Sequence, residues 1–132
     1  MNNPGTYALV AIALTAALAA QAQTPIEDLD GIEAATLECR FGWGSGGTSC
    51  AVVAQVSFDG TNWLDVARFD FLTASAVKVA NLNGHLSKAV TAYAALGSEG
   101  VNDGIMAARW RGVVTSVGTY TNTTVSLRLA AR

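Results

Sequence analysis

The chain has 132 residues, of which 51% are hydrophobic and 14% are charged, and its net charge is -2. This length fits one domain with a sizeable core. The charge gives no reason to expect a nucleic-acid partner, and two cysteines exclude a disulfide-rich scaffold. A surface with so few charged residues is unusual for a free monomer, which indicates that partners cover part of it.

The first predicted element lies in an uncharged apolar stretch over residues 7–25, YALVAIALTAALAAQAQTP. Within it, bulky Val10, Ile12, Leu14 and Leu18 fall on even positions, and small residues fall on the odd positions 11, 13, 15, 17 and 19, which is the period of a β-strand. We therefore predict an N-terminal arm or strand within residues 1–24, and a single β-sandwich domain over residues 25–132. Deletion of residues 1–23 is then expected to leave a folded domain with defective assembly. The candidate subunit contacts of the arm are Val10, Ile12, Leu14 and Leu18.

Two alternatives for this stretch stay open. A signal peptide would be cleaved near Ala22, although signal peptides carry a basic residue before the apolar run and the first one here is Arg40. A helix is favoured by the propensity of alanine. A membrane span is disfavoured, because the run is shorter than about 20 residues and is interrupted by Thr15.

The segment TLECRFGWGSGGTSCAVVAQV contains two alternating runs on either side of a glycine-rich loop, which predicts a hairpin. In that register Cys39 faces Cys50, and both point to the apolar side. Directly opposed strand residues approach closely enough for a disulfide, so Cys39 and Cys50 are candidates for one. Two buried free thiols explain the pattern equally well.

Short alternating runs continue to the end of the chain. The Asp-Gly turn DGTN predicts a hairpin between AVVAQVSF and WLDVARFDF. AVKVANL is a further predicted strand, residues 83–104 form the longest predicted loop, and IMAARWRGVVTSV and VSLRLAAR close the chain as strands. The predicted fold is all-β: an antiparallel β-sandwich or jelly-roll-like domain of about seven or eight strands.

The turn SFDGTNW resembles both the Asp-box hairpin of sialidases and turns of carbohydrate-binding β-sandwiches. We interpret it as structural: Asp59 binds turn amides, Gly60 takes a positive φ and Trp63 packs under the hairpin. A sugar platform needs an exposed aromatic ring, and Trp43 at the tip of the glycine-rich loop is the better candidate.

Other chemistry-bearing residues do not form a recognisable site. The single histidine, His85, has no GxSxG elbow or suitably placed nucleophile to act on. The acidic run EDLDG lacks the spacing of an EF-hand loop, and the glycines of GWGSGG match no nucleotide-binding fingerprint. We predict no catalytic, metal or cofactor site, and hence no enzyme.

Taken in order, several segments resemble the small β-sandwich structural proteins in virions of tailed bacteriophages. They are PIEDLDGIEAATLECRF, AQVSFDGTNWLDVARFDF, VKVANLNG and NDGIMAARWRGVVTSVGTYTNTTVSLRLAAR. The resemblance implies a non-enzymatic capsid decoration or cement protein, assembled in the host cytoplasm as part of the virion. Its implied partners are the major capsid protein and copies of itself, often as a homo-trimer, with no nucleic acid and no membrane.

Two other functions remain open. One is a neck, tail or host-attachment accessory protein of the same particle, which would be present in few copies. The other is a secreted carbohydrate-binding module, which would lose residues 1–22 and bind sugar through Trp43.

Overall fold

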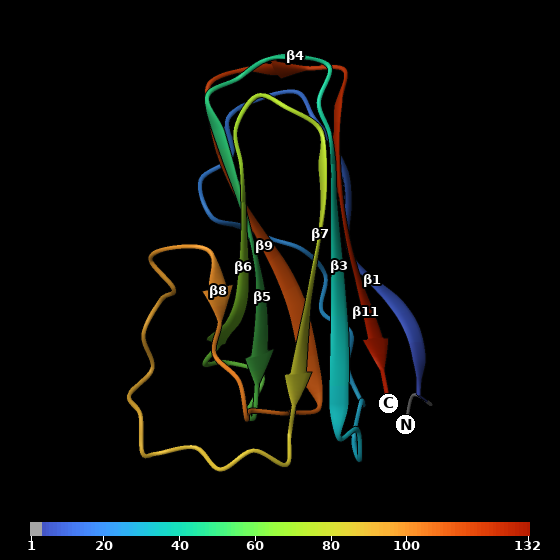
Figure 1. Cartoon of the computed structure of the whole chain (residues 1–132), viewed down its shortest axis with the longest axis vertical. Coiled ribbons are helices and arrows are strands. Elements are labelled where there is room, and N and C mark those ends of the chain that lie inside the picture. Colours follow the sequence, from blue (N-terminus) through green and yellow to red (C-terminus); the bar gives the residue numbers. More distant parts are fainter. Residues whose placement is uncertain (1–3) are drawn as a thin grey trace.

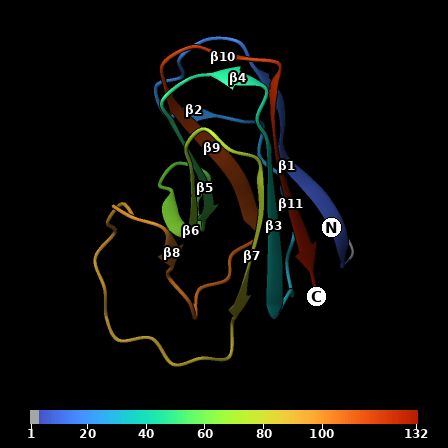
Figure 2. The ribbon, with the colours of Figure 1, turned by 45° about the horizontal axis from the view of Figure 1, so that its top comes forward.

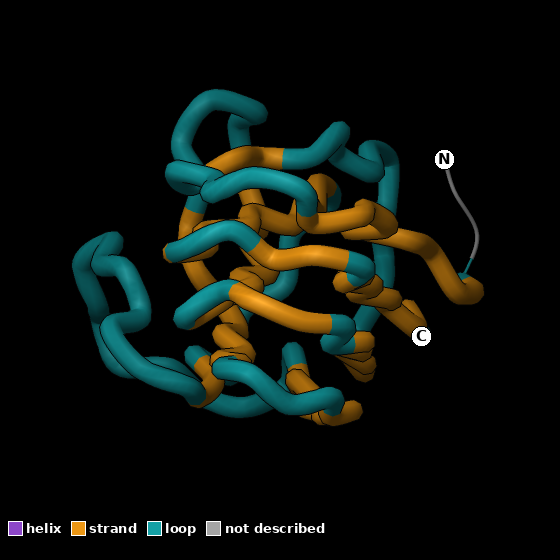
Figure 3. Tube along the Cα trace, turned by 90° about the horizontal axis from the view of Figure 1, so that it is seen from above, coloured by secondary structure: helices purple, strands orange, loops and turns teal. Residues whose placement is uncertain are grey.

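Two antiparallel sheets pack face to face to form a β-sandwich (Figure 1). The computed structural model describes residues 4–132, and these contain eleven strands and no helix. Seven strands have eight residues or more and four have two. Figure 3, coloured by secondary structure, shows strands and loops only. The predicted all-β sandwich is confirmed.

The first sheet, called sheet A, has four long strands in the order β1-β11-β3-β7, each antiparallel to its neighbour. The free edges of the sheet are therefore β1 and β7. The strands are β1 (Gly5–Leu14), β11 (Thr123–Ala131), β3 (Ala34–Gly42) and β7 (Ala76–Asn83).

The second sheet, called sheet B, has the order β2-β9-β5-β6-β8. Its centre consists of three long strands, and a two-residue strand lies at each edge. The strands are β2 (Gln21–Ala22), β9 (Arg109–Val117), β5 (Ser49–Ser57), β6 (Leu64–Phe71) and β8 (Gly100–Val101).

A small third pair, β4 (Ser45–Gly46) with β10 (Tyr120–Thr121), lies across the top of the sandwich (Figure 2). The glycine-rich loop that contains β4 crosses from sheet A to sheet B, and Gly46 and Gly47 in it have φ of 73° and 74°. A Cβ at Gly47 would lie 2.3 Å from the ring of Tyr120. Glycine is needed here both for its conformation and for its size.

The predicted hairpin across this loop is wrong. Strand β3 already pairs with β11 on one side and β7 on the other, so β5 joins sheet B instead. Cys39 lies opposite Leu127 and Lys78, whereas Cys50 lies opposite Ser116 and Phe71. The alternation that suggested one two-stranded ribbon comes from two strands that face the same core from opposite sheets.

The inward-facing side chains of both sheets form one apolar core. Phe41 of sheet A stacks on Phe71 of sheet B with ring centroids 4.9 Å apart, and Tyr120 meets Phe41 edge-on at 5.5 Å. The hydroxyl of Tyr120 donates a hydrogen bond of 2.7 Å to the carbonyl oxygen of Leu72. These aromatic contacts join the two sheets below the β4–β10 pair.

The N-terminal stretch is part of the sandwich. The predicted period-two strand is present as β1, in which Val10 and Leu14 are buried and Ile12 is half-buried. A β-bulge at Leu9 turns that residue inward as well. After β1 the chain crosses to sheet B, where half-buried Leu18 exchanges hydrogen bonds with Ser116 and β2 pairs with β9.

The arm residues predicted to contact another subunit therefore pack within their own chain. Val10 and Leu14 belong to the core, and Ile12 and Leu18 pack against it. The described part of residues 1–24 contributes a strand to each sheet, so it does not form an extension separate from residues 25–132. The small side chains of β1 face outward.

The later predicted strands are present, although the one predicted over IMAARWRGVVTSV begins only at Arg109, as β9. Strands β5 and β6 form the hairpin predicted at the Asp-Gly turn, and β7 covers the predicted run AVKVANL. In the last strand, Val125, Leu127 and Leu129 are buried as the alternation indicates. Residues 84–99 form a long loop that leads from the end of β7 to β8 (Figures 1 and 2).

Candidate interaction surface

The outer face of sheet A is a continuous surface of mostly small side chains. All are exposed or half-buried, and no strand of the described chain covers them. The strand register places them in rows across four strands. They are Thr6, Ala8, Ala11 and Ala13 of β1, Thr124, Ser126, Arg128 and Ala130 of β11, Thr36, Glu38, Arg40 and Gly42 of β3, and Val77, Val79 and Asn81 of β7.

Three charged side chains lie at the centre of this face. Arg40 donates hydrogen bonds of 2.8 Å and 3.4 Å to the carboxylate of Glu38, and Arg128 lies opposite Glu38 on the next strand. The hydrogen bond from Arg40 and the charges of both arginines hold the pKa of Glu38 below its usual value. The face therefore has one positive charge in excess, surrounded by neutral side chains.

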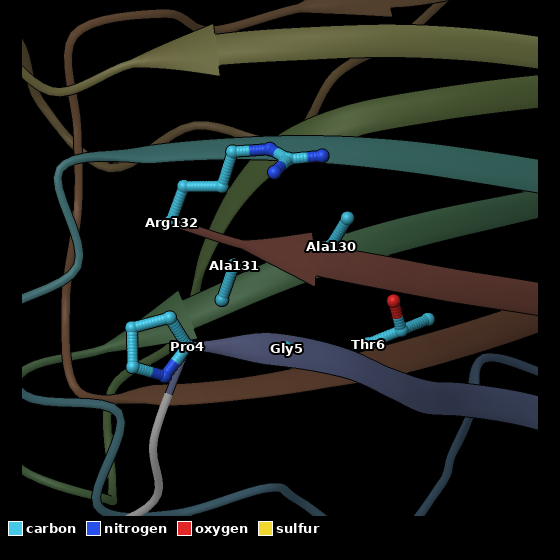
Figure 4. A pocket seen from close by; sticks show the side chains of 6 residues that line it. All are labelled: Pro4, Gly5, Thr6, Ala130, Ala131 and Arg132. Atoms are coloured by element: carbon cyan, nitrogen blue, oxygen red, sulfur yellow. The ribbon is translucent and has the colours of Figure 1, made fainter.

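The two edges of this face differ in side-chain size. On β7, Val77 and Val79 are 55% and 65% exposed, whereas β1 presents alanines. At the end of β1 and β11 there is a hollow of about 340 Å³ (Figure 4). Thr6 and Ala130 lie opposite each other at its rim, next to the side chain of Arg132.

The outer face of sheet B is organised differently, because a chain of hydrogen bonds crosses its strands. Arg111 on β9 donates to Gln55 on β5 at 2.8 Å, and Gln55 donates to Asp65 on β6 at 2.7 Å. The guanidinium of Arg111 also lies 4.2 Å from the ring centroid of Trp63. Trp63, predicted to pack under the hairpin, is thus half-exposed and packs against this cation.

The long loop is attached to this face of sheet B. The second oxygen of Asp65 accepts a hydrogen bond of 2.9 Å from the backbone amide of Leu96, and Arg68 donates one of 2.7 Å to the carbonyl of Leu96. A hollow of about 300 Å³ remains between the loop and the strands. The polar side chains of sheet B thus hold the chain's own loop.

The SFDGTNW turn has the geometry predicted for Asp59 and Gly60. One oxygen of Asp59 accepts hydrogen bonds of 2.8 Å from the amides of both Thr61 and Asn62, and Gly60 has φ of 81°. These amides, with the Asn62 and Ser57 side chains, hold the pKa of Asp59 well below its usual value. The carboxylate acts as the anchor of the turn.

Trp43 does not stand free at the loop tip. Its ring is half-buried and packs against the core, and its indole N–H donates a hydrogen bond of 3.0 Å to the carbonyl of Gly46. Its backbone amide is bound by the hydroxyl of Ser75 at 2.9 Å. A ring held in this way offers only part of one face as a stacking platform.

The two cysteines are buried in the shared core with free thiols. Burial raises the pKa of each thiol to about 12, so both are protonated and unreactive at neutral pH. The core explains both residues as small apolar side chains.

The remaining candidates for chemistry lie apart from one another. His85 is exposed, with Nε2 3.3 Å from a carboxylate oxygen of Glu33. A carboxylate oxygen of Glu27, in the acidic run EDLDG, lies 3.6 Å from Nε of Arg109. Within residues 4–132, no three His, Cys, Asp or Glu side chains come together in an arrangement that could hold a metal ion.

No helix of residues 4–132 is long and apolar enough to cross a membrane.

Comparisons with protein-family models, with curated proteins and with solved structures found no match for this chain. The surfaces of the molecule are therefore the basis for proposing its function.

Sequence reasoning missed the outer face of sheet A as a unit. The signal was present, because the outward residues of β1 and β11 are largely Ala, Ser and Thr, whereas strand prediction depends mainly on the apolar residues of the other face. Which four strands lie side by side depends on pairings between residues far apart in the chain, such as Ala8 with Arg128.

Proposed function

We propose that this chain is a non-enzymatic structural protein of a tailed-phage virion, bound in many copies to the capsid as a decoration or cement protein. The observation that carries the proposal is the uncovered outer face of sheet A, which consists mostly of small side chains. Its partners would be the major capsid protein and other copies of the chain.

The composition of this face suits binding to another protein surface. Alanine and glycine lose no side-chain entropy when they are covered, and short side chains let two backbones approach closely. The charged group of Arg128, Glu38 and Arg40 would give orientation more than affinity, as charges at interfaces commonly do. The face thus combines low ordering cost with one fixed electrostatic feature.

The place of β1 supports a retained N-terminus over the secreted alternative. Cleavage near Ala22 would remove Val10 and Leu14 from the core and leave β11 as an edge strand paired only with β3. The restrained ring of Trp43 likewise gives little support to a sugar-binding role.

Quantitative mass spectrometry of particles purified from the natural source tests the role. The chain is expected in hundreds of copies per particle with residues 1–22 present. A few copies per particle would favour the neck or tail role instead. Absence from particles, or a processed chain found free outside the cell, would refute the proposal.

A pair of threonine variants tests the face itself. Thr124→Arg places a long charged side chain on the outer face of sheet A, and Thr115→Arg places the same one on an exposed strand position of sheet B. Binding to capsids that lack the protein should weaken at least tenfold for Thr124→Arg and change little for Thr115→Arg. The reverse order would exclude this face as the contact.

A further inference from the structure

We propose that the free edge of β7 binds strand β1 of a second copy, antiparallel and head to tail, so that sheet A continues from one molecule to the next. This inference rests on the proposed function in that it assumes a protein working in many copies. It names the contact between those copies, and its test needs no capsid.

The ladder pattern shows which backbone groups of β7 are unpaired. Ala34 and Arg132 exchange both backbone hydrogen bonds, so the backbone groups of Ala34 point toward β11 and away from β7. Alternation along antiparallel strands then turns the N–H and C=O groups of every second β7 residue away from β3. The amide of Asn83 fits this pattern, because it is bound by a carboxylate oxygen of Asp103 at 2.7 Å. The outward residues before it are Val77, Val79 and Asn81.

The same reasoning gives the unpaired groups of β1. Since Arg132 points toward β3, the alternate residues Ala131, Leu129, Leu127 and Val125 point toward β1. These four residues of β11 pair with Gly5, Tyr7, Val10 and Ile12 of β1. The residues of β1 between those pairs therefore direct their N–H and C=O groups to the free edge of the sheet. Those residues are Thr6, Ala8, Ala11 and Ala13.

The edge of β7 has only one of the features that usually prevent strands from adding to a sheet, an inward-pointing lysine, and the charge of that lysine is already paired within the chain. It has no proline and no bulge, and its one charged residue, Lys78, is turned inward. The ammonium of Lys78 lies 2.5 Å from the carbonyl oxygen of Asp70 and 2.6 Å from the carboxylate of Glu99. A long edge strand with exposed Val77 and Val79 and no outward charge is a template for another strand.

Space beside the edge is also open. A hollow of about 400 Å³ separates β7 from β8. Its lining includes the charged side chains of Arg68, Lys78 and Glu99, the last two paired with each other, and the apolar side chains of Val79, Ala80 and Val101. Val101 is itself 45% exposed. An incoming strand would cover these apolar side chains in addition to pairing with β7.

Strand β1 is the segment that matches this edge. The order β1-β11-β3-β7 makes β1 antiparallel to β7, so a copy rotated about an axis along the strands brings the two edges together with the right polarity. β1 is uncharged, and its outward side chains are no larger than threonine. Pairing β1 with β7 also satisfies both edges of every molecule when a ring closes, whereas a β7–β7 contact would leave each β1 edge unpaired.

Two edge-blocking variants test the contact in the purified full-length protein. Val79→Pro and Ala11→Pro each remove an N–H that faces the free edge, so neither removes a hydrogen bond within sheet A. By sedimentation velocity the wild type should self-associate with rising concentration, and each variant alone should remain monomeric. Mixed in equal amounts, the two variants should form a heterodimer. The Val79→Pro protein keeps a free β1 edge and the Ala11→Pro protein keeps a free β7 edge, so these two edges can pair.

Lysine substitutions at Val79 and Ala11 provide a second pair of variants. Lysine keeps the backbone N–H, so a strand tolerates it better than proline, while its charge at the edge discourages pairing with another strand. Val79→Lys and Ala11→Lys should each weaken self-association at least tenfold. Val117→Lys is the matched control: Val117 is 53% exposed but lies on β9, an inner strand of sheet B, and the change should leave association unaltered.

Four results would overturn the inference. They are a wild type that stays monomeric at every concentration, a single blocked variant that still dimerises, a mixture that fails to pair, and an association that Val79→Pro does not alter. The last would indicate exchange of β1 between copies, with β1 of each pairing to β11 of the other. A monomer that still decorates capsids would refute this contact and leave the proposed function intact; a self-associating protein absent from particles would do the opposite.

Discussion

The two sheets use their outer faces in opposite ways. Sheet B binds its own loop: Asp65 and Arg68 hold Leu96, while Gln55 and Arg111 complete a chain of hydrogen bonds across three strands. Sheet A has an outer face of exposed and half-buried side chains with no strand over it, and within residues 4–132 the hydrogen-bonded side chains on that face are the Arg40–Glu38 pair.

This difference separates internal stability from external binding. The polar groups on sheet B are satisfied within the chain, so the loop there is part of the folded domain. On sheet A, exposed small side chains contribute little to folding, and what they can contribute is contact with another surface. The two faces therefore predict different responses to substitution.

The largest loss of stability from a single substitution is expected in β1, the edge strand of sheet A whose inward side chains are part of the core. Leu14 is 1% exposed, and Leu14→Ala should lower the free energy of unfolding by about 2–5 kcal/mol in chemical denaturation. Leu72→Ala, at a leucine that is 66% exposed, is the matched control and should cost much less.

Deletion of residues 1–23 should accordingly give an unfolded chain, which reverses the expectation from sequence. A folded truncated protein, seen as a retained cooperative thermal transition, would show that β1 is an accessory strand after all.

A smaller effect is expected where β1 packs against β9 at Gly112. A Cβ at Gly112 would lie 2.3 Å from Cγ2 of Val10 and 3.2 Å from the carbonyl oxygen of Leu9. Gly112→Ala should therefore destabilise the protein by about 1–3 kcal/mol through overpacking. Gly97→Ala adds the same methyl group to loop 84–99, where nothing lies within 4 Å, and thermal unfolding should show no loss of stability. Equal effects would mean that the bulge at Leu9 relaxes easily.

Asp65→Asn tests the attachment of loop 84–99 to the outer face of sheet B. Both oxygens of Asp65 accept hydrogen bonds from N–H donors, so an amide NH₂ at either position would face another donor. The change should cost about 1–2 kcal/mol and speed amide hydrogen exchange at Leu96, while the core strands stay protected. Asp30→Asn, at an exposed carboxylate, is the control. Unchanged exchange at Leu96 would mean that Arg68 alone holds the loop.

The sequence predicted the strands better than their partners. Alternation located the long strands and the inward side of each, as for Leu127 and Leu129, because a period of two depends only on local geometry and on one buried face. The Asp-Gly turn predicted the one hairpin whose turn chemistry is specific, and Asp59 fixes it with two amide hydrogen bonds.

Pairing between distant strands was not accessible in the same way. The loop GWGSGG has the composition of a hairpin turn, but its glycines serve a crossing between sheets and the close packing of Gly47 on Tyr120. Leu96 was likewise no predictable partner of Asp65, since 31 residues separate them. For the same reason, the face of sheet A emerged only when the β1–β11 and β3–β7 registers were known.

The smallest expected change in stability concerns the outer face of sheet A. Arg128 is exposed at the centre of sheet A, and Arg128→Ser should alter the free energy of unfolding by no more than about 0.5 kcal/mol, as surface substitutions and exposed ion pairs commonly do. Denaturant unfolding of both proteins measures this. A loss well above that value would mean that Arg128, like Arg111 on sheet B, serves the chain's own fold. An unchanged stability together with weaker capsid binding would instead place the function of Arg128 in a contact outside its own chain, because folding would then give no reason for a second positive charge beside the Arg40–Glu38 pair.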